Sequence, residues 1–294
     1  MSIVKNSVTL IKSRPEAIFI WTWCTLIACL VMGNGFPSLT PTFMVMGSIA
    51  LLTASTYIYN DYCDSEMDGH SDVHSDRPIA TGEVSKGFAR GFIAVTAVLG
   101  LGLGYIINMN TFLLGAAYWV MFTLYSAPFV RFKRIFIVKE LVIAIAWPLL
   151  ALAGVYAIGN TFSFTGIYAG LMMGMFSFMG MPALSDSFDE KEDKMYGIKT
   201  LAGALSWPNR VLLLVSALVL MMGITLLTFN RLGFNAVLPI TIVGSSLLLL
   251  RMVAPIYKSF DQEKALKVRK ITYLYVMLSQ VFVVLGSMSL PLPF

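Results

Sequence analysis

Residues 41–68 read PTFMVMGSIALLTASTYIY followed directly by NDYCDSEMD. The first part, residues 41–59, carries no charge. As a helix rising about 1.5 Å per residue, it nearly crosses the roughly 30 Å of hydrocarbon in a bilayer. The second part places four acidic side chains within nine residues. An apolar helix that ends in such a group of carboxylates indicates a membrane span with its chemistry at one membrane surface.

The rest of the chain repeats this apolar pattern. Of its 294 residues, 57% are hydrophobic and only 13% are charged, and the mean hydropathy is +0.77. A soluble domain usually has about 25% charged residues. We expect nine spans, near residues 17–32, 41–59, 88–107, 112–127, 137–157, 166–182, 211–229, 236–250 and 271–290. No polar block of domain size separates them, so the sequence predicts a single polytopic all-α membrane domain over residues 1–294.

The basic residues predict how the chain is oriented. Counted over alternate loops, 20 of the 21 Lys and Arg residues fall on one side, and only Arg231 falls on the other. Positive charge concentrates on the cytoplasmic side of membrane proteins. We therefore expect an integral protein of the plasma or inner membrane with its N-terminus and charged loops cytoplasmic and its C-terminus outside. This distribution accounts for the net charge of +5 without a nucleic acid partner.

Two acidic clusters lie on the predicted cytoplasmic side. In the first acidic cluster, residues 60–68, three aspartates are spaced i, i+3, i+7 and Asn60 lies beside them: Asp61, Asp64 and Asp68. The second acidic cluster, residues 186–193, repeats the spacing with Asp186, Asp189 and Asp193. At about 3.6 residues per turn, each triplet shares one helix face. Like charges on one face repel, so each cluster is expected to need a counter-cation.

Magnesium fits these clusters because it prefers oxygen ligands and is commonly held by one or two carboxylates together with substrate phosphates. Two clusters that face each other would bind a diphosphate through bridging metal ions. The alternative is that both clusters are ordinary solvated helix ends without a bound metal. His70 and His74, spaced i, i+4, are an alternative candidate for a transition-metal site. The three cysteines form no C-x-x-C pair, so they support neither zinc nor a redox motif.

Basic side chains accompany both clusters. Arg77 precedes Pro78 in the first charged loop, Lys133 ends the run that begins at Tyr125, and Lys199 follows the second cluster. Such cations suit a diphosphate, because Lys and Arg donate charge-assisted hydrogen bonds to phosphate oxygens. The alternative is that they only satisfy the positive-inside rule.

These motifs together resemble the UbiA superfamily of intramembrane prenyltransferases. Asn60-Asp61-x-x-Asp64-x-x-x-Asp68 resembles its first signature, and Asp186-x-x-Asp189-x-x-x-Asp193 resembles its second. Arg77-Pro78-Ile79, Tyr125-Ser126-x-Pro128 with Lys133, and Gly197-Ile198-Lys199-Thr200-Leu201 resemble three further family segments. Two features depart from the family pattern. The stretch before Arg77 is longer and holds Asp72, His74 and Asp76, and Glu192 stands where the family usually has Gly.

The resemblance implies a ring of nine helices around a central cavity that opens to lipid. It implies seven magnesium ligands: Asn60, Asp61, Asp64, Asp68, Asp186, Asp189 and Asp193. The resemblance also implies that Arg77, Lys133 and Lys199 contact the diphosphate and that Tyr125 lies beside them. Among these residues, Asp64, Asp68, Asp189 and Lys133 are expected to matter most for catalysis.

The implied activity is magnesium-dependent transfer of an isoprenyl chain from an allylic polyprenyl diphosphate to a lipophilic acceptor, with release of pyrophosphate. A quinone precursor, a chlorophyllide-like ring or a glycerol phosphate lipid would each suit the family as acceptor. One rival is a terpene cyclase of the same fold, which needs no acceptor. A cation transporter is a second rival, but transporters usually place ionisable residues near mid-membrane. The sequence does not predict an oligomeric state.

Overall fold

The computed structural model describes residues 2–71 and 73–289, without the side chain of Glu192. These residues form helices and loops, and no strand occurs among them. The α-helices are α1 (Ile3–Lys12), α2 (Pro15–Met32), α3 (Leu39–Asp68), α4 (Lys86–Ile107), α5 (Met109–Ser126), α6 (Val138–Gly159), α7 (Phe164–Leu184), α8 (Asp186–Met195), α9 (Leu201–Ala204), α10 (Trp207–Thr228), α11 (Val237–Val253) and α12 (Gln262–Ser287). Two short 3₁₀ helices, η1 (Phe132–Arg134) and η2 (Ala254–Ile256), complete the set.

Each of the nine predicted spans falls on one of these helices. Within the described part of the chain, eight helices are long and apolar enough to cross a membrane: α2, α3, α4, α6, α7, α10, α12, and α11 together with η2. The remaining predicted span, residues 112–127, corresponds to α5, which has 18 residues but is not among those eight. The predicted all-α membrane fold is therefore confirmed, and the count of nine is approximate.

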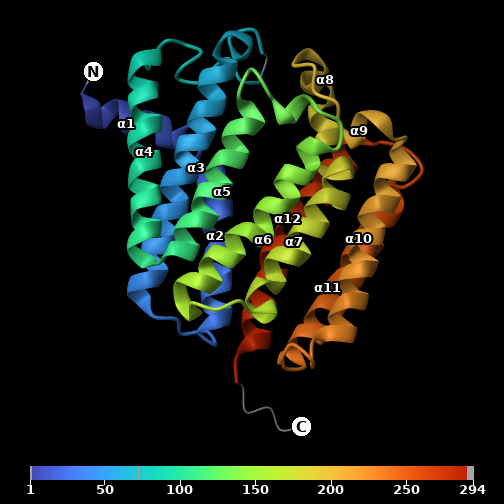
Figure 1. Cartoon of the computed structure of the whole chain (residues 1–294). Helices are drawn as coiled ribbons and strands as arrows, with labels where there is room; N and C mark the ends of the chain where they lie inside the picture. Colours follow the sequence, from blue (N-terminus) through green and yellow to red (C-terminus); the bar gives the residue numbers. More distant parts are fainter. Residues whose placement is uncertain (1, 72, 290–294) are drawn as a thin grey trace.

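The long helices form a ring. Helices α2 to α7 contact one another in chain order, α7 continues through α10 and α11 to α12, and α12 returns to α2. Figure 1 shows α1, the α3–α4 loop, α8 and α9 at one end of this ring, whereas α12 finishes at the other end. The predicted C-terminal segment Pro291-Leu292-Pro293-Phe294 lies outside the described residues. The predicted ring of membrane helices is confirmed.

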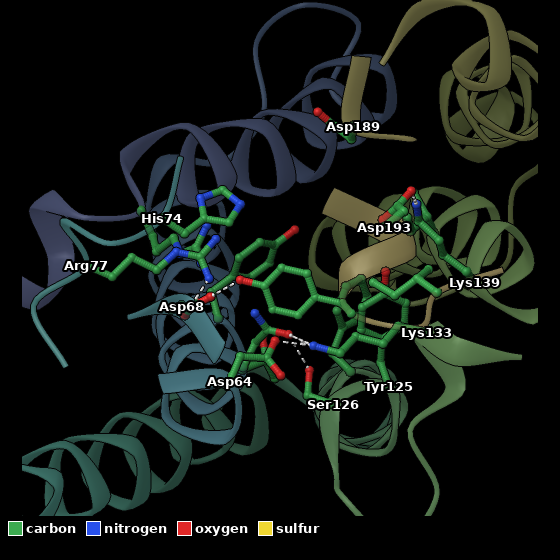
Figure 2. A pocket seen from close by; sticks show the side chains of 18 residues that line it. Asp64, Asp68, His74, Arg77, Tyr125, Ser126, Lys133, Lys139, Asp189 and Asp193 are labelled. Carbon is green, nitrogen blue, oxygen red and sulfur yellow. Dashed lines mark hydrogen bonds and ion pairs between the residues drawn. The ribbon is translucent and has the colours of Figure 1, made fainter. Parts of the chain in front are cut away.

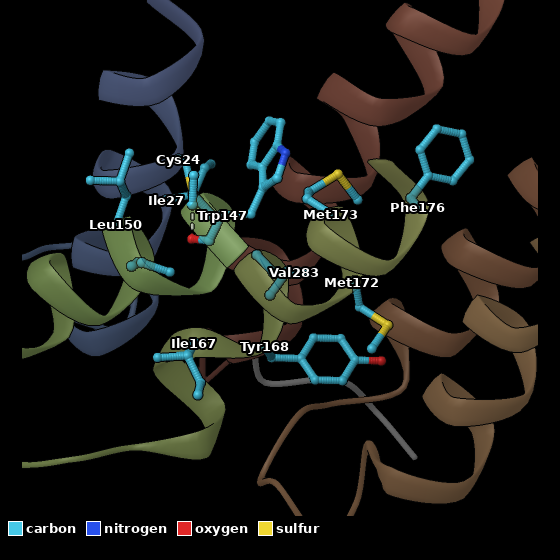
Figure 3. Close-up of a cluster of buried hydrophobic side chains, with 14 of the residues drawn as sticks. Cys24, Ile27, Trp147, Leu150, Ile167, Tyr168, Met172, Met173, Phe176 and Val283 are labelled. Carbon is cyan, nitrogen blue, oxygen red and sulfur yellow. Dashed lines mark hydrogen bonds between the residues drawn. The ribbon is translucent and has the colours of Figure 1, made fainter. Parts of the chain in front are cut away.

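Close packing of α7 against α6 holds the middle of the ring together. Gly166, Gly170 and Gly174 recur every four residues along α7. A Cβ atom at Gly174 would lie 2.5 Å from the carbonyl oxygen of Ala144, so only glycine fits there. Small residues at this spacing let membrane helices approach closely. Around this contact, buried apolar side chains of α2, α6, α7 and α12 fill the ring (Figure 3).

Two different helix ends carry the acidic clusters. Helix α3 runs unbroken through the first cluster, as the sequence predicts, and ends at Asp68 with Gly69 as its C-cap. The second cluster lies on a separate helix, because α7 ends at Leu184 shortly after Pro182 and α8 starts at Asp186. The Ser187 hydroxyl donates to the Pro182 carbonyl (2.6 Å) across this break. Both clusters therefore reach the same end of the ring on helices of different length.

Candidate functional site

A cavity of about 250 Å³ opens at the end of the ring that carries the charged loops (Figure 2). Both acidic clusters contribute oxygen-bearing side chains to its wall, namely Asn60, Asp64, Asp68, Asp189 and Asp193. Apolar and aromatic groups line it as well: Tyr57, Phe122, Tyr125, Ile143, Tyr196 and Ile198. The cavity thus combines a charged part with an apolar part, as an amphiphilic ligand requires.

Asp64 is the centre of the first acidic cluster, and two cations hold it. The Lys133 ammonium and the Arg131 guanidinium both form ion pairs with its carboxylate. Lys133 Nζ also donates to Asn60 Oδ1 (3.0 Å), which accepts a second hydrogen bond from the Ser126 hydroxyl (2.9 Å). Burial lowers the pKa of the Lys133 ammonium, and the Asp64 carboxylate offsets part of that shift. This group joins α3, the end of α5 and η1 at the cavity wall.

The other two aspartates of the first cluster share one arginine. Arg77 Nη1 lies 3.2 Å from Asp61 Oδ1 and 2.8 Å from Asp68 Oδ2. Arg14, at the start of α2, forms a second ion pair with Asp61. The Tyr196 hydroxyl donates to Asp68 Oδ1 (2.7 Å) from the segment after α8. All three carboxylates of this cluster are buried and have cationic partners.

The second acidic cluster is organised around Lys139, the second residue of α6. Its ammonium lies 3.3 Å from Asp186 Oδ1 and 3.0 Å from Asp193 Oδ2. Burial raises the pKa of the Asp193 carboxyl to about 6, although Lys139 opposes the shift. Asp189 is exposed, and in Figure 2 it stands apart from Asp193 and Lys139. Arg210 of α10 holds α8 in place by donating to Ser187 (3.0 Å) and Glu190 (3.1 Å).

The counter-cations that both clusters are expected to need are, in this structure, arginine and lysine side chains. They come from the start of α2, from the segments after α3 and α5, and from the start of α6. Among the described residues, no three His, Cys, Asp or Glu side chains are grouped to hold a metal ion. The chemistry of the cavity still fits magnesium, because carboxylate and amide oxygens from both clusters converge on one space.

The remaining predicted residues have varied positions. Tyr125 and Arg77 line the cavity, whereas Asp61 and Asp186 lie behind its wall in ion pairs. Lys199 is exposed and lines a neighbouring cavity of about 450 Å³ that shares Asp193 and Ile198 with the first. Its predicted contact with a diphosphate is not supported by this position and stays a prediction.

The two histidines lie in different surroundings. His74 lines the cavity, while His70 is exposed and its Nδ1 lies 2.9 Å from the Glu66 carbonyl oxygen. Asp76 is exposed. Asp72 lies outside the described residues.

Sequence reasoning missed four residues of this site: Arg14, Arg131, Lys139 and Tyr196. The three cations were counted among the charges that set topology, and nothing in their spacing separates them from the others. A signal was available for Lys139, since a charged residue inside an apolar run of predicted span is uncommon and needs a partner. The two i, i+3, i+7 triplets had no such ambiguity, because a helix alone brings their members together.

Comparison with known proteins agrees with this geometry. A model of the UbiA prenyltransferase family matches residues 21–282. A 4-hydroxybenzoate octaprenyltransferase from Pseudomonas entomophila (strain L48) is 25% identical over 226 residues, which cover 74% of this chain and 72% of that protein.

Solved structures share the fold at low sequence identity. A digeranylgeranylglyceryl phosphate synthase structure superposes with a TM-score of 0.77 at 20% identity, covering 99% of this chain and 100% of that one. A UbiA homolog from Archaeoglobus fulgidus bound to GPP and Mg²⁺ gives a TM-score of 0.68 at 18% identity, covering 94% and 99%. The family match extends over most of the chain and includes both acidic clusters. The chain therefore belongs to the UbiA prenyltransferase family and is an intramembrane prenyltransferase.

Proposed function

We propose that this enzyme transfers an isoprenyl chain from an allylic polyprenyl diphosphate to a lipophilic acceptor, in a magnesium-dependent reaction that releases pyrophosphate. The observation that carries the proposal is the shared cavity, in which both acidic clusters and four cations, Arg14, Arg77, Lys133 and Lys139, meet an apolar wall. An allylic diphosphate has the same two parts, a charged head and an apolar tail.

The acidic side chains are the candidates to hold magnesium. Asn60, Asp64 and Asp68 would act from α3, and Asp189 and Asp193 from α8. Asp61 and Asp186, also predicted as ligands, adjoin these residues through Arg77 and Lys139. Bound magnesium would supply positive charge that stabilises a departing pyrophosphate. The solved homolog with GPP and Mg²⁺ supports this choice of ion.

The basic side chains would bind the diphosphate oxygens. Lys133 and Arg77 both line the cavity, and each donates a hydrogen bond to a carboxylate in this structure. An arriving diphosphate offers them further acceptors at closely similar positions. Donors already aimed at the place where negative charge grows lower the barrier most, because they need little reorganisation. Lys133 and Arg77 would therefore assist cleavage of the allylic C–O bond.

The aromatic side chains of the cavity wall would stabilise the allylic carbocation that this cleavage leaves. The ring centroids of Phe122 and Tyr125 lie 5.8 Å apart, and Tyr57 stacks on Phe122 with 6.2 Å between centroids. Aromatic faces attract cations, so these rings suit an allylic carbocation. The apolar surroundings would also exclude water, which otherwise captures the cation. The acceptor carbon or oxygen then forms the new bond and loses its proton.

The acceptor is proposed from chemistry and from the relatives. The name of the 4-hydroxybenzoate octaprenyltransferases specifies an aromatic acceptor. The name of the digeranylgeranylglyceryl phosphate synthase specifies a glycerol phosphate lipid. Because the 4-hydroxybenzoate octaprenyltransferase is the more similar of the two in sequence, at 25% against 20% identity, we favour an aromatic quinone precursor. A chlorophyllide-like ring and a glycerol phosphate lipid are the other acceptors to test.

The membrane orientation is part of the proposal. The basic loops are expected to be cytoplasmic in the plasma or inner membrane, with the cavity opening on that side. A cysteine placed at the exposed position Asp76 should escape a membrane-impermeant thiol reagent added outside intact cells. Labelling there would reverse the orientation.

Product analysis tests the function directly. Purified enzyme is incubated with magnesium, geranylgeranyl diphosphate and each acceptor in turn, and the lipids are identified by mass spectrometry. We expect a prenylated acceptor that disappears with EDTA and returns with added magnesium. A cyclised product formed without any acceptor would identify a terpene cyclase instead. Undiminished transfer in chelator would exclude the magnesium-dependent mechanism.

A further inference from the structure

Helix α1 lies outside the ring of spans and has no part in the proposed chemistry. Figure 1 shows it running across α4 near the end that carries the charged loops, whereas α3 and α4 run along the ring axis. Its buried side chain, Leu10, packs in a small apolar cluster with Ile58 of α3 and Ala89 of α4. Asn6, Ser7 and Thr9 are partly buried as well, whereas the other side chains of α1 are exposed.

These contacts fix the depth of α1 relative to the membrane. Ile58 lies less than one helical turn before Asp61, the first carboxylate of the first acidic cluster. Ala89 is the fourth residue of α4, which starts at Lys86. Leu10 therefore packs at the level where apolar spans give way to charged loops. That level corresponds to the headgroup region of a bilayer, where amphipathic helices lie in the plane of the membrane.

The outward side of α1 has a composition suited to that position. Four of its apolar side chains are exposed: Ile3 (76%), Val4 (71%), Val8 (42%) and Ile11 (45%). At 3.6 residues per turn, these four lie within about 140° of arc, and Lys5 and Lys12 lie together beside that arc. Both lysines are exposed, and neither has an ion-pair partner among the described residues. Lysines beside an apolar face are typical of helices that bind anionic membranes.

We propose that α1 docks on anionic phospholipids at the side of the charged loops and thereby holds Arg14 in the cavity. The apolar face would enter the boundary between headgroups and acyl chains. The ammonium groups of Lys5 and Lys12 would extend to lipid phosphates, as long basic side chains do at interfaces. This partner is chosen over a protein partner because the face lies at membrane depth and both of its charges are positive.

A short connection links the docked helix to the site. Helix α1 ends at Lys12, and only Ser13 and Arg14 separate it from Pro15, the first residue of α2. Arg14 forms an ion pair with Asp61 and lines the cavity. Arg77 then joins Asp61 to Asp68. Release of α1 from lipid would loosen Arg14 and, through Asp61 and Arg77, the diphosphate end of the cavity.

Hydrogen exchange of the whole protein in lipid nanodiscs tests the docking. The nanodiscs contain phosphatidylcholine alone or phosphatidylcholine mixed with phosphatidylglycerol. With two lysines near an anionic surface, protection of the α1 amides should rise about thirtyfold in the mixed lipid. The double variant Lys5→Gln/Lys12→Gln should lose this difference between the two lipids. The matched control Lys258→Gln/Lys267→Gln, which removes two exposed lysines elsewhere, should keep it.

A second measurement tests the link to Arg14 and rests on the proposed function, whereas hydrogen exchange does not. Binding of geranylgeranyl diphosphate with magnesium is measured without acceptor in the mixed-lipid nanodiscs. Lys5→Gln/Lys12→Gln should weaken binding several-fold, and the control variant should bind like the parent. Equal α1 protection in both lipids would overturn the docking. Lost protection with unchanged diphosphate binding would overturn the coupling to Arg14.

Discussion

The three aspartates of the first acidic cluster are buried and paired with four cations, whereas in the second cluster Lys139 bridges two aspartates and the third aspartate is exposed. Both clusters have the same i, i+3, i+7 spacing. The difference arises from the helices that carry them. Helix α3 continues for 30 residues and enters the ring with loops folded over its end, while α8 is a separate helix of 10 residues at the rim. Spacing determines which carboxylates share a face, and the surrounding helices determine how each is neutralised.

The comparison predicts its largest effect at Asp64, the central aspartate of the first cluster. Asp64→Asn should reduce single-turnover prenylation at saturating magnesium by about a hundredfold or more. The same change should also destabilise the protein. Removing one member of a buried ion pair leaves Lys133 and Arg131 partly uncompensated, which costs on the order of 3 kcal/mol. Heating in detergent, followed by size-exclusion chromatography, measures that loss.

Relief of repulsion between the aspartates would predict the opposite change in stability. If Asp64→Asn is as heat-resistant as the parent, the ion pairs of the first cluster contribute little. If it also turns over like the parent, the first cluster is not the reacting end of the cavity.

A second prediction concerns Asp189, the equivalent aspartate of the second cluster. Asp189→Asn should also lower turnover by about a hundredfold, because a metal ligand at a developing pyrophosphate is worth several kcal/mol of barrier. Its heat resistance should match the parent, since the side chain is exposed. Heating and chromatography of both variants in parallel compares the structural roles of the two clusters. An equal loss of heat resistance in both variants would mean that the two clusters stabilise the fold to the same extent. Normal turnover of Asp189→Asn would remove it from the proposed metal ligands.

Lys139 offers a smaller test of the second cluster. Lys139→Gln leaves Asp186 and Asp193 without their shared cation, so the two carboxylates should repel and shift α8. We expect binding of the magnesium–diphosphate pair to weaken by about tenfold, equivalent to about 1.4 kcal/mol. Lys194→Gln is the matched control, because Lys194 is exposed on α8 and pairs with Glu190 (3.0 Å) among the described side chains. Equal binding by both variants would show that Lys139 does not organise the cluster.

The smallest effect is expected outside both clusters. Asp72→Asn and Asp76→Asn change acidic residues that do not belong to either spaced triplet. Each should keep turnover within about tenfold of the parent, which corresponds to less than about 1.4 kcal/mol of barrier. Steady-state prenylation rates of these variants are measured together with those of the parent and of Asp64→Asn, which shows how large a loss a change at a proposed metal ligand causes. A hundredfold loss at Asp76 would mean that the longer stretch before Arg77 takes part in the reaction.

The sequence by itself determined the membrane class, the approximate spans and the two carboxylate triplets. These features depend on local regularities. An apolar run of sufficient length must be a span, and helical periodicity alone brings Asp61, Asp64 and Asp68 to one face. It also predicted that both triplets lie at one end of the molecule, because the alternation of spans places 20 of the 21 basic residues on that side, with Arg231 as the exception.

Only the tertiary structure decided which cation meets which carboxylate. Arg14 and Asp61 are 47 residues apart, and Lys133 and Asp64 are 69 apart. Lys199 was predicted at the diphosphate and lies in the neighbouring cavity, whereas Lys139 was overlooked and bridges Asp186 and Asp193. Basic residues on one side of a membrane look alike in sequence. Helix packing and loop paths select among them, because an ion pair depends on distance in space, which a sequence records only for neighbours.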